Sequence, residues 1–152
     1  MIPAFLALML QVAPAPVCAT TAAPPAGLEA WGAPAAVTTG PVAIGKGAGL
    51  TLQPVEKVAF ARAPDRAPKP GSFGGVYPFD VATAGTYRIA LDAGAWIDVV
   101  RDGKSLESVA HMEGPACSGI RKIVDFTLTP GHYALQLSNA GKAPMRVLIV
   151  PR

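Results

Sequence analysis

The chain has 152 residues and a net charge of +3, and its Lys and Arg residues are scattered along the sequence. Because no basic run occurs and aromatic residues do not alternate with arginines, this charge pattern argues against nucleic-acid binding. Hydrophobic residues make up 51% of the chain, charged residues 15%, and Gly and Pro number 16 each, which is typical of short strands joined by turns and not of long helices.

The first predicted element is a signal peptide. Residues 2–12 form an apolar stretch that is too short to span a bilayer as a helix but suits a signal-peptide core. Small residues allow cleavage after residues 13–15 or, with a better following residue, after residues 17–19. No Lys or Arg precedes the apolar core, which is atypical. We predict a signal peptide over 1–19, export to the periplasm or medium, and no membrane span in the rest of the chain.

The two cysteines, Cys18 and Cys117, fit an oxidising compartment. If processing spares Cys18, the pair is expected to form a disulfide that ties the N-terminal segment to a later loop. If cleavage follows Ala19 instead, Cys117 is left alone.

Two segments lack strand patterns. Residues 20–48 are rich in Ala, Pro, Gly and Thr and predict an extended lead-in, with Leu28 and Trp31 as anchors onto the core. Residues 61–75 contain prolines and a glycine cluster that exclude a regular element, so this segment is predicted to be a loop. The folded domain is expected to cover 49–152.

The rest of the domain reads as consecutive strands. Pro78 places its strand at a sheet edge or bulge, and Asp102-Gly103 predicts a hairpin turn. The even spacing predicts an all-β fold, a single antiparallel β-sandwich of jelly-roll type with no long helix after the signal peptide. The expected strands are 50–52, 76–81, 87–91, 96–100, 106–110, 120–128, 133–137 and 145–150. Period-two alternation predicts that the following side chains point inward: Tyr87, Ile89, Leu91, Val124, Phe126, Leu128, Tyr133, Leu135 and Leu137.

Two of these strands begin alike. A turn glycine, one residue, a tyrosine and alternating apolar positions occur in both 83–91 and 129–137. Each tyrosine, Tyr87 and Tyr133, is expected to bury its ring while its hydroxyl reaches backbone at the corner of the sandwich.

The second half of the chain resembles the bacterial pre-peptidase C-terminal domains. The residues that carry the resemblance are Tyr77-x-Phe79-x-Val81-x-x-Ala84-Gly85-Thr86-Tyr87, Trp96–Val100 with Asp102-Gly103, and Leu128-x-Pro130-Gly131-x-Tyr133. The resemblance implies a secreted β-sandwich used for binding or as an accessory to other domains, and it transfers no catalytic residue.

The segment from His111 to Lys122 is similar to a stretch in small exported bacterial proteins of unknown role, some of which bear the name homogentisate 1,2-dioxygenase. A non-haem iron dioxygenase needs two histidines and a carboxylate, and His111, His132 and Glu113 are the minimum set. His111-x-Glu113 lacks the second nearby histidine, however, and His132 follows a Pro-Gly turn, where an exposed side chain is ordinary. The sequence therefore argues against this site.

A zinc or copper site is the stronger metal hypothesis, because imidazole and thiolate together suit these ions. Its ligands would be His111, Cys117 and Glu113. The competing interpretation, which we favour, is a disulfide-bonded Cys117 beside a solvent-facing His111. Asp98 and Asp102 are too few carboxylates for a calcium site, and Ser118 lacks a nucleophile elbow.

The other notable side chains are predicted to have structural roles. Trp96 is expected to be a core anchor, and Arg88, Arg101, Arg121 and Lys122 are expected on solvated strand faces. We therefore predict an exported, non-catalytic binding or accessory module without a cofactor, whose partner is a small ligand or another exported protein. The alternative is a metal-dependent enzyme with zinc, copper or iron bound around His111.

Overall fold

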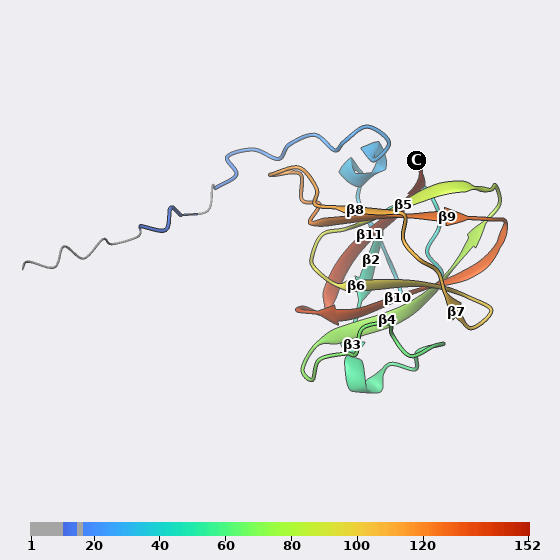
Figure 1. Cartoon of the computed structure of the whole chain (residues 1–152). Helices are drawn as coiled ribbons and strands as arrows, with labels where there is room; N and C mark the ends of the chain where they lie inside the picture. Colours follow the sequence, from blue (N-terminus) through green and yellow to red (C-terminus); the bar gives the residue numbers. More distant parts are fainter. Residues whose placement is uncertain (1–10, 15–16) are drawn as a thin grey trace, which may run out of the picture.

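The computed structural model describes residues 11–14 and 17–152. Most of the predicted signal-peptide core therefore lies outside the described residues. The described chain forms two β-sheets packed face to face (Figure 1). Its helical parts are two short 3-10 turns, η1 (Glu29–Gly32) and η2 (Val55–Lys57). This confirms the predicted all-β sandwich, and none of the described helices is long and apolar enough to cross a membrane.

The two sheets differ in strand number. Sheet A has six strands in the order β1 (Ala36–Thr38), β2 (Ala48–Thr51), β11 (Pro144–Pro151), β5 (Gly85–Leu91), β9 (Lys122–Leu128) and β8 (Ala110–Met112). Sheet B has five, in the order β3 (Gln53–Pro54), β4 (Phe73–Val81), β10 (Gly131–Ala140), β6 (Trp96–Arg101) and β7 (Lys104–Ser105). β1 pairs with β2 in parallel, and the larger strands pair antiparallel.

The core lies between the sheets, as the alternation predicts. Every side chain expected to point inward is buried and belongs to one hydrophobic cluster. Phe79 and Tyr133 stack within it, with ring centroids 5.5 Å apart. The two corner tyrosines are also confirmed: the Tyr87 hydroxyl donates to the Thr83 carbonyl at 2.6 Å, and the Tyr133 hydroxyl to the Thr129 carbonyl at 2.7 Å.

The predicted hairpin turn and the predicted edge position of Pro78 are confirmed as well. Asp102 and Gly103 have φ angles of 50° and 72°, the left-handed conformation that a two-residue hairpin turn requires, and they join β6 to β7. The strand β3 pairs with β4 only at Phe73 and Gly74, so β3 does not extend along β4 as far as Pro78. Pro78 thus occupies an edge position, where its carbonyl accepts the Val42 amide at 2.9 Å.

One predicted strand is wrong. Residues 106–110 do not form a continuous strand, because β7 ends at Ser105 in sheet B and β8 begins at Ala110 in sheet A. The intervening chain crosses from one sheet to the other. Single hydrogen bonds hold its ends, from the Leu106 amide to the Val99 carbonyl and from the Val109 amide to the Asp125 carbonyl. Apolar residues at 106 and 109 mimic a strand, but a segment that changes sheets cannot pair along its length.

The first part of the predicted lead-in covers the outer face of sheet A, whereas its second part is not merely extended: residues 36–38 form β1, and Val42 and Ala48 belong to the main core cluster. Leu28 and Trp31, at 0% and 4% exposure, confirm the predicted anchors. They pack with Ala90, Ile120, Ile123, Leu148 and Val150 in a second hydrophobic cluster on the far side of that sheet. In Figure 1 the light-blue turn η1 lies on the side of sheet A that faces away from the strands of sheet B. The guanidinium of Arg146 stacks over the Trp31 ring at 4.6 Å and fixes it further.

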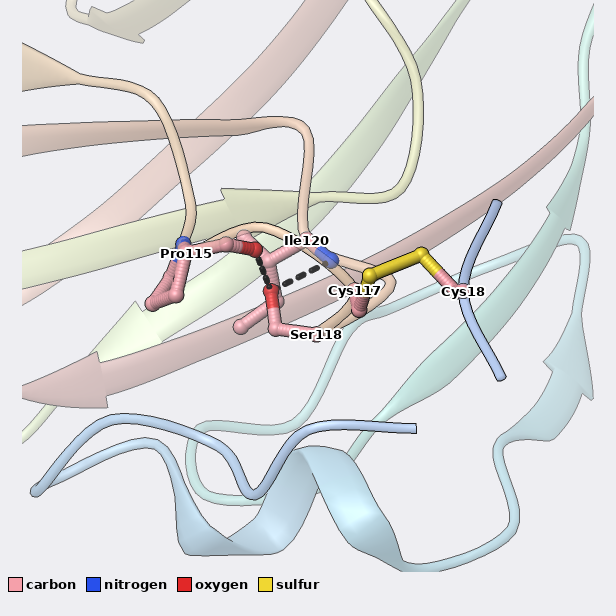
Figure 2. The surroundings of a disulfide bond; sticks show 5 residues. All are labelled: Cys18, Pro115, Cys117, Ser118 and Ile120. Atoms are coloured by element: carbon pink, nitrogen blue, oxygen red, sulfur yellow. Dashed lines mark hydrogen bonds between the residues drawn. A yellow bond between two sulfur atoms is a disulfide. The ribbon is translucent and has the colours of Figure 1, made fainter. Parts of the chain in front are cut away.

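The predicted disulfide is present. Cys18 and Cys117 are bonded at 2.03 Å, with their Cα atoms 5.5 Å apart. Figure 2 shows the bond joining the N-terminal segment to the loop ahead of β9. The Ala22 amide donates to the Cys117 carbonyl at 2.7 Å, so a backbone hydrogen bond reinforces the covalent link.

Candidate functional site

A cleft opens where the edges of the two sheets approach each other. It has a volume of about 530 Å³, within the range of small-molecule sites. The strands β7 and β8 are too short to close this side, because β7 pairs only with Val100 and Arg101 and β8 only with residues 123–125. The lining residues are Asp65, Arg66, Trp96, Ile97, Asp98, Leu106, Glu107, Ser108, His111, Lys122, Val124 and Phe126.

The floor of the cleft is the hydrophobic core itself. Ile97, Val124 and Phe126 line the cleft and also belong to the main core cluster. Leu106, from the segment that crosses between the sheets, also lines the cleft and packs against the same cluster. The cleft therefore brings a ligand into contact with apolar side chains of the core.

Two cations meet at the ring of Trp96. The Lys122 Nζ lies 5.6 Å from the ring centroid and donates to the Ala95 carbonyl at 2.7 Å. The Arg66 guanidinium lies 4.5 Å from the same centroid. Partial burial lowers the pKa of Lys122, and the positive charge of Arg66 lowers it further. Within the described chain, neither cation has a carboxylate oxygen within 4.0 Å.

The buried acid of the cleft is already engaged. Asp98, 3% exposed, accepts hydrogen bonds from the Trp96 indole at 3.0 Å, the Asp65 amide at 3.2 Å and the Ser105 hydroxyl at 3.5 Å. Asp65 in turn accepts from Ser105 at 2.8 Å and lies 3.7 Å from Arg62. Burial raises the pKa of Asp98, although the hydrogen bond from Trp96 opposes the rise.

The predicted loop 61–75 ends at Ser72, because residues 73–75 already form the start of β4, which pairs with β10. The part of the loop between residues 61 and 69 lies across the outer face of sheet B. Gln136, 1% exposed, accepts from the Ala61 and Arg62 amides at 2.8 and 3.2 Å and donates to the Arg62 carbonyl at 3.1 Å. Asn139 accepts from the Lys69 amide at 2.7 Å. Together with Asp98, these strand side chains supply hydrogen bonds that a loop backbone otherwise takes from water. They thereby position Arg66 at the cleft.

The pH dependence of stability tests the environment of Asp98. A carboxyl group whose pKa is raised by folding binds its proton more readily in the folded state. Its protonation therefore adds stability as the pH falls toward the unfolded value, 3.8. Asp98→Asn removes this contribution, so the variant should lose more unfolding free energy between pH 7 and pH 4 than the unaltered protein does. Urea denaturation at both pH values measures it.

The comparison of two pH values cancels the hydrogen-bond changes that the substitution makes at every pH. Asp102→Asn is the matched control, because that carboxylate is 92% exposed. It should leave the pH profile close to that of the unaltered protein. Equal pH profiles for Asp98→Asn and the unaltered protein would contradict a raised pKa at Asp98.

The residues of the metal hypothesis lie beside this cleft. His111 lines it from β8, and His111 and Lys122 also line an adjoining cavity of about 430 Å³ that includes Glu113. Glu113 accepts from the Arg121 guanidinium at 2.6 Å. The Cys117 sulfur is bonded to Cys18, so it offers no thiolate while that bond stands. Over residues 11–14 and 17–152, no cluster of three or more His, Cys, Asp or Glu side chains is suited to holding a metal ion.

Two other predicted side chains have defined surroundings. The Ser118 hydroxyl donates to the Pro115 carbonyl at 2.7 Å and accepts from the Ile120 amide at 3.2 Å (Figure 2), which holds the loop that carries Cys117. The imidazole of His132 is exposed and pairs with Asp80, its cross-strand neighbour.

The sequence missed the part that Trp96, Asp98 and Lys122 play. Trp96 is not a core anchor: Ile97 and Val99 occupy the core, so alternation sends Trp96 and Asp98 to the outer face of sheet B. Lys122 is half-buried and not on a fully solvated face. The available signal was the Trp-x-Asp spacing on one strand face, which places an indole donor beside a carboxylate.

No protein-family model matches the sequence, and no curated protein is significantly similar to it. Among solved structures, the fold is similar to the pre-peptidase C-terminal domain of a collagenase from Bacillus anthracis. The likeness has a TM-score of 0.43 and 14% identity, and it covers 76% of this chain and 96% of that one.

Proposed function

We propose that this chain is a non-catalytic binding module whose ligand occupies the cleft between β6 and β9. The observation that carries the proposal is the combination of an apolar floor with converging polar groups in a cavity of about 530 Å³. Ligand sites in proteins have this make-up, in which apolar surface supplies affinity and a few polar groups fix orientation.

The arrangement of reactive side chains supports binding over catalysis. Nucleophilic catalysis requires a nucleophile within hydrogen-bond reach of a base. The Ser118 hydroxyl is instead engaged by backbone groups, and Cys117 is held in the disulfide. His111 lines the cleft but is exposed at a sheet edge.

A fragment screen by ligand-observed NMR tests the proposal. Compounds with an apolar group should bind, and Ser108→Trp should abolish binding, because a large side chain at this exposed position on the lining fills the cleft without entering the core. Lys57→Trp, an equally large change at an exposed site in η2, should leave binding intact. Hits that survive Ser108→Trp would place binding elsewhere, and a screen without hits would contradict the proposal.

We further propose that the module acts outside the cytoplasm. The apolar stretch 2–12 and the disulfide support this, because disulfides persist in oxidising compartments. Fractionation of the native host, with mass spectrometry of the N-terminus, tests it. We expect a shortened chain in the periplasm or medium, and a full-length chain in the cytoplasm would contradict export.

A further inference from the structure

We propose that the cleft binds a carboxylate that carries an apolar body, with its carboxylate group between Lys122 and Arg66 and its body on the floor formed by Ile97, Val124 and Phe126. This inference rests on the proposed function and names the class of ligand. It depends on which hydrogen-bonding groups of the cleft are occupied by the protein and which are not.

Lys122 and Arg66 have N–H donors without a protein acceptor among the described residues. An ammonium group has three N–H donors and a guanidinium group five. Lys122 uses one in the bond to Ala95, and no hydrogen bond from the Arg66 side chain is present in the described part of the chain. Both groups lie within 5.6 Å of the Trp96 ring centroid and line the same cleft, and the charge of Arg66 lowers the pKa of Lys122, so the two like charges repel each other. An anion between them would relieve that repulsion and accept their free N–H groups.

The carboxylates of Asp98 and Asp65, in contrast, already accept hydrogen bonds from the protein. Both oxygens of Asp98 and one of Asp65 receive hydrogen bonds from protein donors. Asp65 is also paired with Arg62. Glu107 lines the cleft but is exposed, where solvent screens its charge. A cationic ligand would therefore meet carboxylates whose charge the protein already partly compensates, whereas an anionic ligand would pair with cations that have no carboxylate partner among the described residues.

The acids also limit the charge of the ligand. With Asp98 and Asp65 lining the same cleft, a dianion such as a phosphate monoester meets more repulsion than a singly charged carboxylate does. The apolar floor adds a second requirement, because burying it under a fully polar ligand gains little. A singly charged head on an apolar body satisfies both conditions.

Three probes that share a phenylalkyl group test which head group the cleft prefers. They are 4-phenylbutanoate, a carboxylate, 4-phenylbutanamide, a neutral amide, and 4-phenylbutylamine, a cation. The full chain is titrated with each at low ionic strength, and the indole N–H signal of Trp96, assigned with Trp96→Phe, reports binding by NMR. We expect the carboxylate to bind about tenfold or more tightly than the amide, the gain typical of a hydrogen bond to a charged group. The amine should bind more weakly than either.

Variants then assign the preference to the two cations. Lys122→Met keeps the aliphatic stem and removes the charge, and Arg66→Met does the same from an exposed loop position that is not part of the core. Each should reduce the preference for carboxylate over amide and leave the affinity for the amide nearly unchanged. Lys57→Met, an exposed cation in η2, should keep the full preference.

The outcomes distinguish this inference from the proposed function. Equal binding of the amide and the carboxylate, tightest binding of the amine, or a preference that survives both cation variants would overturn the inference while leaving a binding cleft. Fragment hits in the cleft without binding of any of the three probes would overturn it in the same way. Absence of both probe binding and fragment hits would contradict the proposed function itself.

Discussion

Replacing both cysteines, in Cys18→Ser/Cys117→Ser, should lower the free energy of unfolding by up to about 4–5 kcal/mol. The bond closes a loop with a sequence separation of 99, and cross-linking such a loop removes much of the conformational freedom of the unfolded chain. This change in unfolding free energy is an upper value, because disulfides often contribute less than the loop-entropy model predicts. Urea denaturation of the oxidised protein and the variant measures the difference.

The loss should first be visible in the lead-in. Its contacts with sheet A are made by Leu28 and Trp31, and the disulfide and the hydrogen bond from Ala22 fix the segment before them. Without the bond, the amide of Ala22 should exchange with solvent faster, while amides of β5 and β9 keep their relative protection. Cleavage of the chain after Ala19 would remove Cys18 and should have the same effect.

Reductant supplies the matched control for this prediction. It should destabilise the unaltered protein to the level of the double variant and have no effect on the variant itself. Equal urea midpoints for the oxidised protein and the variant would show that the bond contributes no stability.

The strands and corners could be predicted from the sequence because their signals are local. Alternation placed Leu135 and Leu137 in the core, and Asp102-Gly103 placed a hairpin, from a few neighbouring residues each. The disulfide was predictable for a different reason: with two cysteines in the chain, the pairing has one solution once both survive.

The cleft could not be predicted, because it depends on contacts between distant segments. Gln136 alternates with core leucines and is expected in solvent, yet it is buried under the loop at residues 61 and 62. Nothing local indicates that a proline-rich loop lies on sheet B. Likewise, the crossing at 106–109 that leaves the sandwich edge open follows from which sheet each neighbouring strand joins.

Asp125→Ala should destabilise the protein by about 3–5 kcal/mol, the cost typical of removing one partner from a buried ion pair. Asp125 is 0% exposed and accepts from the Arg88 Nε and Nη2 at 2.9 and 3.1 Å. The hydrogen bond to Asp125 raises the pKa of Arg88, so the guanidinium stays charged. Arg88 is thus no solvated strand residue: its side chain is 16% exposed, and the variant leaves its charge without its partner.

The reason for the loss can be separated from simple packing. Arg88→Met/Asp125→Leu removes both charges and fills the space with apolar groups, so it should recover most of the stability that Asp125→Ala loses. Arg152→Met is the control for a solvent-screened contact, since Arg152 lies 3.5 Å from Asp125 with a 58% exposed side chain, and it should cost about 0–1 kcal/mol. If the double variant were as unstable as Asp125→Ala, the loss would come from packing and not from an unpartnered charge. A double-mutant cycle with Arg88→Met, measured by urea denaturation, gives the interaction energy of the pair directly.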